Sequence, residues 1–135
     1  MACLVPAVPY SNRDNYIHVA RRLAKKINGY FCNQFDNTSN RDGHIKTTGP
    51  EIWNTLEGKL DAFTTAVGTG GTLAGISIAL KERCSEILTV AADPEGSAIH
   101  DFIKFGTLTS VGDSITEGIG QGRITDNLKG APIDS

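Results

Sequence analysis

The sequence predicts an α/β fold in three layers, with a parallel sheet that is covered by helices on both faces. Three observations predict it. Helical and strand-like segments alternate along the chain. The strand-like segments are continuous apolar runs, which is typical of strands buried on both faces. A glycine-rich turn, Gly68-Thr69-Gly70-Gly71-Thr72, joins one such strand to a helix.

The first third of the chain predicts a helix and a short strand. We expect the helix to begin at Ser11-Asn12-Arg13-Asp14, where Ser11 and Asp14 have capping-box spacing. Apolar residues then recur at helical spacing up to Ile27, and the basic residues on the opposite side are expected to be solvated. Asn28-Gly29 ends the helix, and Tyr30 to Phe35 predicts a buried strand. The polar segment from Asp36 to Gly43 predicts a loop.

The rest of the chain predicts two further strands and three helices. Thr47-Thr48-Gly49-Pro50-Glu51 is expected to open a helix with a threonine hydroxyl as its cap. Leu60 to Val67 predicts a strand that ends in the glycine-rich turn, and a helix follows the turn. Ile87 to Ala92 predicts the next strand, and Ser97 to Phe105 predicts the last helix.

Composition excludes several classes of protein. The net charge of −2 gives no basic surface for nucleic acid. The three cysteines, Cys3, Cys32 and Cys84, are far apart and odd in number, which argues against a disulfide framework or a zinc site and favours a reducing, intracellular compartment. The uncharged stretch from Ala62 to Leu80 is divided by the glycine-rich turn, so we interpret it as two buried elements and expect no membrane span. No metal site is expected.

The glycine-rich turn predicts an anion site. Glycines allow consecutive backbone N–H groups to point into one concavity, and a helix N-terminus adds the positive end of its dipole. The dinucleotide fingerprint would need glycine at Leu73, and the Walker A motif would need lysine at Ile76, so neither fits. A mononucleotide-like or cofactor phosphate remains. The alternative is a tight turn whose glycines serve packing alone.

Several blocks together resemble the cysteine synthase (O-acetylserine sulfhydrylase) family of fold-type II pyridoxal-phosphate enzymes. The similarity covers most of the chain, and two further segments resemble a divergent fungal-type branch. The family blocks are Gln34-Phe35-Asp36-Asn37, His44, Thr47 to Trp53 and Gly68 to Thr72, and the branch segments are Pro9 to Asn12 and Glu117 to Gly122.

The resemblance implies pyridoxal 5′-phosphate as cofactor and a set of site residues. Gly68, Thr69, Gly70, Gly71 and Thr72 would cup the cofactor phosphate. Gln34 would bind the α-carboxylate of a small amino-acid substrate; its alternative role is to cap a neighbouring backbone. Gly118 and Gly120 would lie near the cofactor, where absent side chains permit close approach, or they form a flexible surface turn.

The resemblance also places the chain within a two-domain enzyme. Residues 1–40 would end the small cofactor-side domain, and residues 41–135 would form the first half of the large phosphate-binding domain. The Schiff-base lysine of the family would lie upstream of Gln34, so we expect an internal fragment with no catalytic lysine. The sequence departs from the family pattern at Asn37-Thr38-Ser39-Asn40 and at Gln121-Gly122-Arg123.

The activity that the resemblance implies is β-replacement, in which L-cysteine forms from an O-acylated serine and sulfide. Cystathionine β-synthase and serine/threonine dehydratase are alternatives because they share the phosphate loop. The Thr47 to Trp53 block favours cysteine synthase or cystathionine β-synthase over the dehydratase. A non-catalytic remnant that binds phosphate or a partner subunit is a further alternative. The full-length protein is expected to be a homodimer and to reside in the cytoplasm or the mitochondrion.

Overall fold

The computed structural model describes residues 2–111 and 118–135. Glu117, from the segment that resembles the fungal-type branch, lies outside the described residues. The chain divides into two compact units, of which the first ends at Asn33 and the second begins at Gln34.

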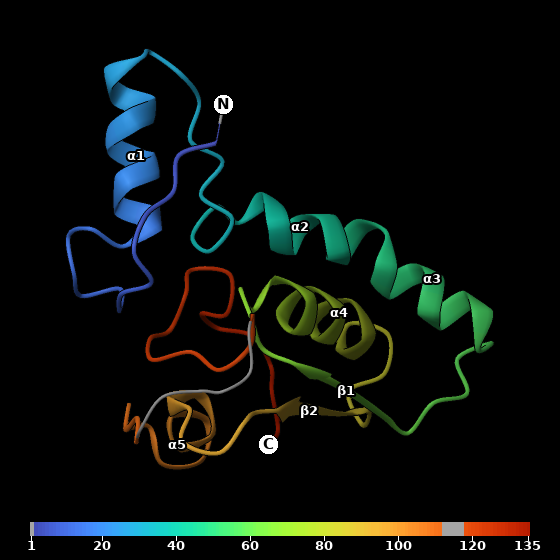
Figure 1. Ribbon diagram of the computed structural model, residues 1–135. Helices are drawn as coiled ribbons and strands as arrows, with labels where there is room; N and C mark the ends of the chain where they lie inside the picture. The colour runs from blue at the N-terminus through green and yellow to red at the C-terminus, as the bar shows by residue number, and fades with distance from the viewer. Residues whose placement is uncertain (1, 112–117) are drawn as a thin grey trace. The chain divides into compact units, whose positions relative to one another are not determined.

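The first unit contains helix α1, Tyr16–Lys26 (Figure 1). The expected capping box is wrong: Asn15 is the N-cap residue, and its Oδ1 accepts a hydrogen bond from the Ile17 N–H at 3.0 Å. Asn15 prevails because it is buried and its Nδ2 also donates to the Val8 carbonyl at 2.7 Å, which ties the cap to the preceding segment.

The strand expected over Tyr30 to Phe35 is also wrong. Residues 30–33 have no regular structure, and residues 34–36 form a turn. Asn33 has a φ of 47°, which lies in the left-handed region and is incompatible with an extended strand. The apolar residues of this segment therefore predicted a strand that the left-handed backbone at Asn33 interrupts.

The second unit holds the remaining elements. They are α2 (Ser39–Lys46), α3 (Thr48–Thr55), β1 (Ala62–Ala66), α4 (Gly71–Lys81), β2 (Leu88–Ala92) and α5 (Ala98–Phe105). The strands β1 and β2 pair in parallel, with Ala62 opposite Leu88 and Ala66 opposite Ala92. The predicted α/β class with a parallel sheet is confirmed, and α4 is the crossover between the strands (Figure 1).

Helix α2 replaces the loop that was expected over Asp36 to Gly43. The Asn37 Oδ1 accepts a hydrogen bond from the Ser39 N–H at 3.1 Å, which organises the turn before the helix. Helices α2 and α3 pack along α4, and α4 packs on the sheet (Figure 1). Tertiary packing therefore overrides the weak helix propensity of this polar segment.

Helix α3 begins where expected but without its expected cap. Thr47 is the N-cap residue and makes no side-chain cap hydrogen bond. Its hydroxyl donates instead to the Gly43 carbonyl at 2.8 Å, back into α2. The two helices follow each other so closely that the preceding turn competes for the threonine.

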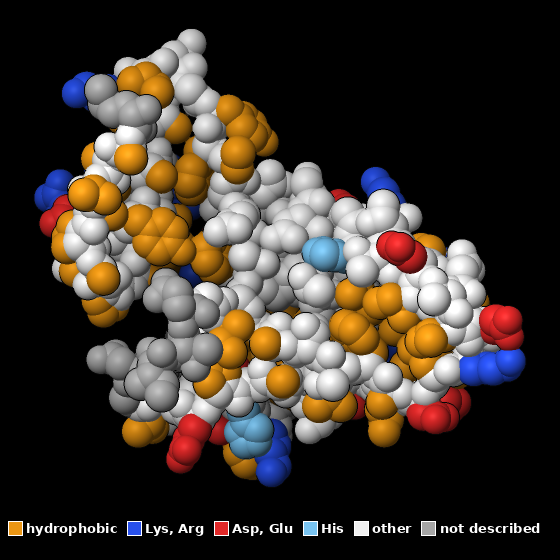
Figure 2. All heavy atoms as spheres, turned by 45° about the vertical axis from the view of Figure 1, so that its right-hand side comes forward, with side chains coloured by type: hydrophobic (Ala, Val, Ile, Leu, Met, Phe, Trp, Pro, Cys, Tyr) orange, Lys and Arg blue, Asp and Glu red, His pale blue; other side chains and the backbone are white. Residues whose placement is uncertain are grey.

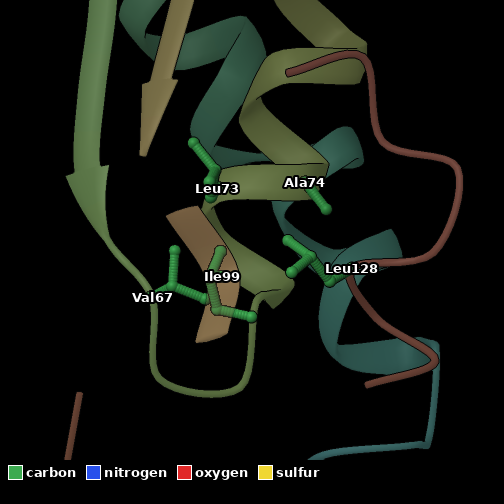
Figure 3. Close-up of a cluster of buried hydrophobic side chains, with 5 residues drawn as sticks. All are labelled: Val67, Leu73, Ala74, Ile99 and Leu128. Carbon is green, nitrogen blue, oxygen red and sulfur yellow. The ribbon is translucent and has the colours of Figure 1, made fainter. Parts of the chain in front are cut away.

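Two clusters of buried side chains form the core of the second unit, and both are centred on α4. Leu73 and Ala74 of α4 form one cluster with Val67, Ile99 and Leu128 beside the glycine-rich turn (Figure 3). Ile76, Leu80 and Ile87 form the second cluster. The turn is therefore held on a rigid base.

Surface exposure of hydrophobic side chains is considerable (Figure 2). On the sheet, Phe63 packs against both clusters, whereas Ala62 and Thr64 point to the other face and are exposed. Leu88 on the same face of β2 is 55% exposed. The last residues run along the free edge of β2, where the Ala91 N–H donates to the Ser135 carbonyl at 2.6 Å.

Candidate functional site

The glycine-rich turn lies between β1 and α4, as the sequence predicted. Two of its glycines are required by close packing. A Cβ at Gly68 would lie 2.5 Å from the Gly118 carbonyl oxygen, and a Cβ at Gly71 would lie 2.3 Å from the Asn40 Oδ1. These contacts explain the glycines without a ligand, so the glycines alone do not distinguish an anion site from a tight turn.

The N-terminus of α4 provides the evidence for a ligand. Gly70, with a φ of 83°, is the N-cap residue and offers no side chain. Within the part of the chain that the structure describes, the N–H groups of Thr72 and Leu73 have no hydrogen-bond acceptor. Leu73 is fully buried, so its N–H is shielded from solvent. Unpaired buried N–H groups are rare, and at a helix N-terminus they favour an anion.

The Thr69 hydroxyl adds a further donor. Its Oγ1 accepts hydrogen bonds from the Gly71 N–H at 3.3 Å and from the Asn40 Nδ2 at 3.0 Å. Because both lone pairs of this oxygen are engaged, its own proton is free to donate to an anion. The Thr125 hydroxyl donates to the Thr69 carbonyl at 2.7 Å and fixes the backbone of the turn.

Helix α2 contributes a histidine to the same turn. His44 Nε2 lies 3.2 Å from the Thr72 Oγ1, and His44 Nδ1 lies 2.9 Å from the Thr48 Oγ1. When Thr48 donates to Nδ1, Nε2–H donates to Thr72 and leaves the Thr72 proton for an anion. Thr72 and His44 lie 28 residues apart in the sequence, and the packing of α2 on α4 brings them together.

Gln34 stands beside this turn. Its backbone carbonyl accepts hydrogen bonds from the Asn40 Nδ2 at 2.9 Å and from the Asn127 Nδ2 at 2.8 Å. Gln34 itself is exposed, and its amide makes no hydrogen bond within the described residues. The backbone is thus held while the amide remains free for a ligand, and the alternative role as a cap of the neighbouring backbone is not observed.

The segment that contains Gly118 and Gly120, called the glycine segment here, forms another border of the candidate site. Gly118 and Gly120 have φ values of 82° and 83°, and the Gly120 N–H donates to the Val67 carbonyl at 3.2 Å. Gln121 is anchored at the start of α5, where its N–H donates to the Ser97 Oγ at 3.1 Å. The expected site residues Gln34, Gly68 to Thr72, Gly118 and Gly120 therefore converge.

Sequence reasoning missed the asparagine that joins these segments. Asn127 is completely buried. Its Nδ2 donates to the carbonyls of Gln34 and Phe35 at 2.8 and 2.7 Å, and its Oδ1 accepts from the Arg41 N–H at 3.2 Å. No local pattern marks a buried asparagine in a polar tail, so the sequence held no signal for it.

The described ranges also bear on other kinds of site. Residues 2–111 and 118–135 contain no group of three metal-ligating side chains and no helix that is long and apolar enough to cross a membrane. Cys3 and Cys84 are free thiols. Ala62 to Leu80 forms a strand and a helix, as expected.

The chain is similar to known proteins over most of its length. The family model described as "Pyridoxal-phosphate dependent enzyme" matches residues 4–133. The chain belongs to this family. It is 56% identical over 129 residues to Cysteine synthase 1 of Emericella nidulans and 54% identical to Cysteine synthase 1 of Neurospora crassa. These matches cover 93% of this chain in each case, and 35% and 34% of the relatives.

Solved structures agree with this placement in the pyridoxal-phosphate dependent family. The crystal structure of O-ureido-L-serine synthase matches with a TM-score of 0.75 and 30% identity, over 87% of this chain and 35% of that one. O-Acetyl Serine Sulfhydrylase isoform 3 from Entamoeba histolytica matches with a TM-score of 0.69 and 36% identity, over 84% and 32%. The resemblance to cysteine synthases is confirmed, and the chain spans about a third of the length of the curated relatives it matches.

The residues present fit the phosphate of this cofactor. The buried Leu73 N–H, the Thr72 N–H and the Thr69 hydroxyl converge on the start of α4. Because Gly68 and Gly71 carry no Cβ, the backbone of the turn packs directly against Gly118 and Asn40. When bound, the cofactor supplies an electron sink that stabilises negative charge at the substrate α-carbon.

Proposed function

We propose that this chain provides the phosphate cup and the substrate-carboxylate turn of an enzyme that forms L-cysteine from an O-acylated serine and sulfide. The observation that supports it best is the N-terminus of α4, where the unpaired N–H groups of Thr72 and Leu73 lie beside the Thr69 hydroxyl. The relatives named Cysteine synthase 1 support the choice of reaction.

Each segment has a role in the proposed site. Gly68 to Thr72 bind the cofactor phosphate through the helix N-terminus and threonine hydroxyls. Gln34 donates its amide N–H to the α-carboxylate of the amino acid, and Asn127 holds the backbone from which that amide extends. Gly118 and Gly120 border the cofactor. No lysine of this chain is assigned a catalytic role.

Phosphate binding is tested with the chain itself. Thr69→Val should weaken the binding of pyridoxal phosphate and of inorganic phosphate by about tenfold to a hundredfold, because one hydrogen bond to an anion is lost. Thr64→Val in β1 makes the same chemical change at an exposed position and should leave binding unchanged. The same loss in both variants, or no binding by the unaltered chain, would contradict the proposed cup.

The reaction is tested by grafting. This chain replaces the matching third of Emericella nidulans Cysteine synthase 1, and formation of cysteine from O-acetylserine and sulfide is measured. We expect the hybrid to make cysteine and to lose this activity with Gln34→Ala. A hybrid that instead releases a keto acid, or that condenses serine with homocysteine, would assign the chain to the dehydratase or the cystathionine β-synthase activity.

A second candidate is a chain that binds phosphate or a partner subunit without catalysis. The exposed hydrophobic side chains of the second unit, such as Leu88 on β2, support a surface for a partner subunit. This candidate predicts phosphate binding by the chain together with an inactive hybrid.

Three further assignments belong to this proposal. We propose that residues 1–40 close the small domain and residues 41–135 begin the large one, and the division between Asn33 and Gln34 supports a boundary in this region. We propose a homodimer for the whole protein. We propose a location in the cytoplasm or the mitochondrion, which the free thiols of Cys3 and Cys84 support.

A further inference from the structure

One ion pair in the second unit joins the turn that contains Gln34 to the residues that follow the glycine segment. The Arg123 guanidinium donates from Nη1 to the Asp36 Oδ1 at 2.8 Å and from Nη2 to the Asp36 Oδ2 at 3.0 Å. Only 23% of the Arg123 side chain and 16% of the Asp36 side chain are exposed. The ion pair is therefore bidentate and largely buried, and such pairs are among the stronger ones in proteins.

Neighbouring groups fix both partners of the pair. The Arg123 guanidinium carbon lies 5.8 Å from the centre of the Phe35 ring. The Asp126 N–H donates to the Asp36 Oδ1 at 3.2 Å. The carboxylate therefore receives hydrogen bonds from a side chain and from the backbone, both on the segment that follows Gly122.

The pair connects the turn that presents Gln34 to the glycine segment. Asp36 lies in the same turn as Gln34, two residues away. Arg123 follows Gln121, whose backbone is anchored on Ser97 at the start of α5. The Gln34 turn is thus held from two sides, by Asn127 at its carbonyls and by Arg123 at its carboxylate.

The glycine-rich turn and the start of α4 have supports of their own besides this pair. Thr69 is held by Asn40 and Thr125, and α4 is held by its buried core. A change at Arg123 should therefore reach Gln34 before it reaches the N-terminus of α4.

We infer that Arg123 and Asp36 are positioning residues that set the Gln34 amide for an amino-acid carboxylate, without contributing to phosphate binding. This inference rests on the proposed function, since it assigns a support to the same site. Breaking the pair should weaken the binding of a small amino acid selectively. Lysine at position 123 should restore this binding only in part, because an ammonium group cannot form the bidentate contact.

The experiment follows two ligands in the full chain. L-Serine is titrated, with pyridoxal phosphate present, by the chemical shift of the Gln34 side-chain amide, and inorganic phosphate is titrated by the shifts of Thr72 and Leu73. Arg123→Met should raise the Kd for L-serine about tenfold and change the Kd for phosphate less than twofold. Arg123→Lys should lie between Arg123→Met and the unaltered chain.

Two additional measurements separate positioning from general loss of structure. Amide hydrogen exchange at Phe35, Asp36 and Asn37 should accelerate about tenfold in Arg123→Met, while exchange in α4 stays unchanged. Glu57→Gln, which breaks the exposed ion pair between Lys59 and Glu57, is the matched control and should change neither ligand's Kd.

The outcomes distinguish the inference from the proposed function. If the unaltered chain binds phosphate and L-serine but Arg123→Met changes neither Kd, or changes both equally, the inference is wrong and the proposed function stands. If the unaltered chain binds no phosphate, the proposed function fails and the inference fails with it. If Asp36→Asn reproduces the selective loss of L-serine, both are supported.

Discussion

Replacing Asn127 by alanine is expected to destabilise the second unit strongly. The side chain is completely buried and makes three hydrogen bonds, to the carbonyls of Gln34 and Phe35 and to the Arg41 N–H. The Gln34 carbonyl keeps its second partner, the Asn40 Nδ2. The Phe35 carbonyl and the Arg41 N–H are therefore the two groups that lose their partner in the described structure.

The magnitude follows from those two groups. A buried polar group left without a partner costs about 1–3 kcal/mol. Both backbone groups belong to residues that are partly accessible to water, which favours the lower part of this range. We expect Asn127→Ala to lower the free energy of unfolding by about 2–4 kcal/mol and the Tm by roughly 10 °C.

Urea unfolding followed by Trp53 fluorescence and circular dichroism measures this loss. Asn54→Ala is the matched control, since Asn54 is exposed in α3 and its side chain makes no hydrogen bond in the described structure. Asn127→Asp should be still less stable, because a carboxylate would face two carbonyl oxygens. A loss below about 1 kcal/mol in Asn127→Ala, less than one such unpaired group predicts, would refute the role assigned to this residue.

Two further predictions concern a glycine and a carboxylate. Gly71→Ala should lower stability by about 1–3 kcal/mol in thermal unfolding, since its Cβ would lie 2.3 Å from the Asn40 Oδ1. The helical Gly43 has no atom within 4 Å of such a Cβ, so Gly43→Ala should raise stability by about 0.5–1 kcal/mol; a fall in that variant would contradict the argument. The hydrogen bond from Lys81, reinforced by the Thr89 N–H, holds the pKa of Asp134 below its ordinary value of 3.8. A lowered pKa means that this contribution is complete above the unfolded pKa and is lost as pH falls below about 4, so Asp134→Asn should reduce the loss of stability between pH 5 and pH 2, roughly the interval in which a carboxylate titrates.

The strand–turn–helix portion of the fold could be predicted because its signals are local. Continuous apolar residues before Gly68 and after Cys84 became β1 and β2, and the helix between them has a buried face as expected. The last helix was expected from Ser97 and begins at Ala98, because the Ser97 side chain caps it by accepting a hydrogen bond from the Ile99 N–H. In these segments, propensity and tertiary packing favour the same structure.

The failures occur where tertiary contacts decide. The segment from Asp36 to Gly43 has the composition of a loop, but it becomes helical because it packs against α4. Gly75 permits this close packing, since a Cβ there would lie 2.5 Å from the Arg41 carbonyl oxygen. The glycine and the helix that it accommodates are far apart in the sequence, so no window of local pattern contains both.

The site residues could be proposed from the sequence, whereas the hydrogen-bond network around them could not, because that network too is built from distant segments. Gln34 and the glycine-rich turn lie in motifs that can be compared with a family, but Asn127 and Arg123 lie in a polar, glycine-dotted tail. Their roles arise only when that tail folds back on the Gln34 turn and offers a buried amide and a guanidinium to its backbone and carboxylate. In this arrangement the groups proposed to touch ligand lie on short turns and at the start of α4, and distant polar side chains hold those turns in place. Substitutions in the tail should therefore change how Gln34 meets a ligand more than they change the helix N-terminus that binds phosphate.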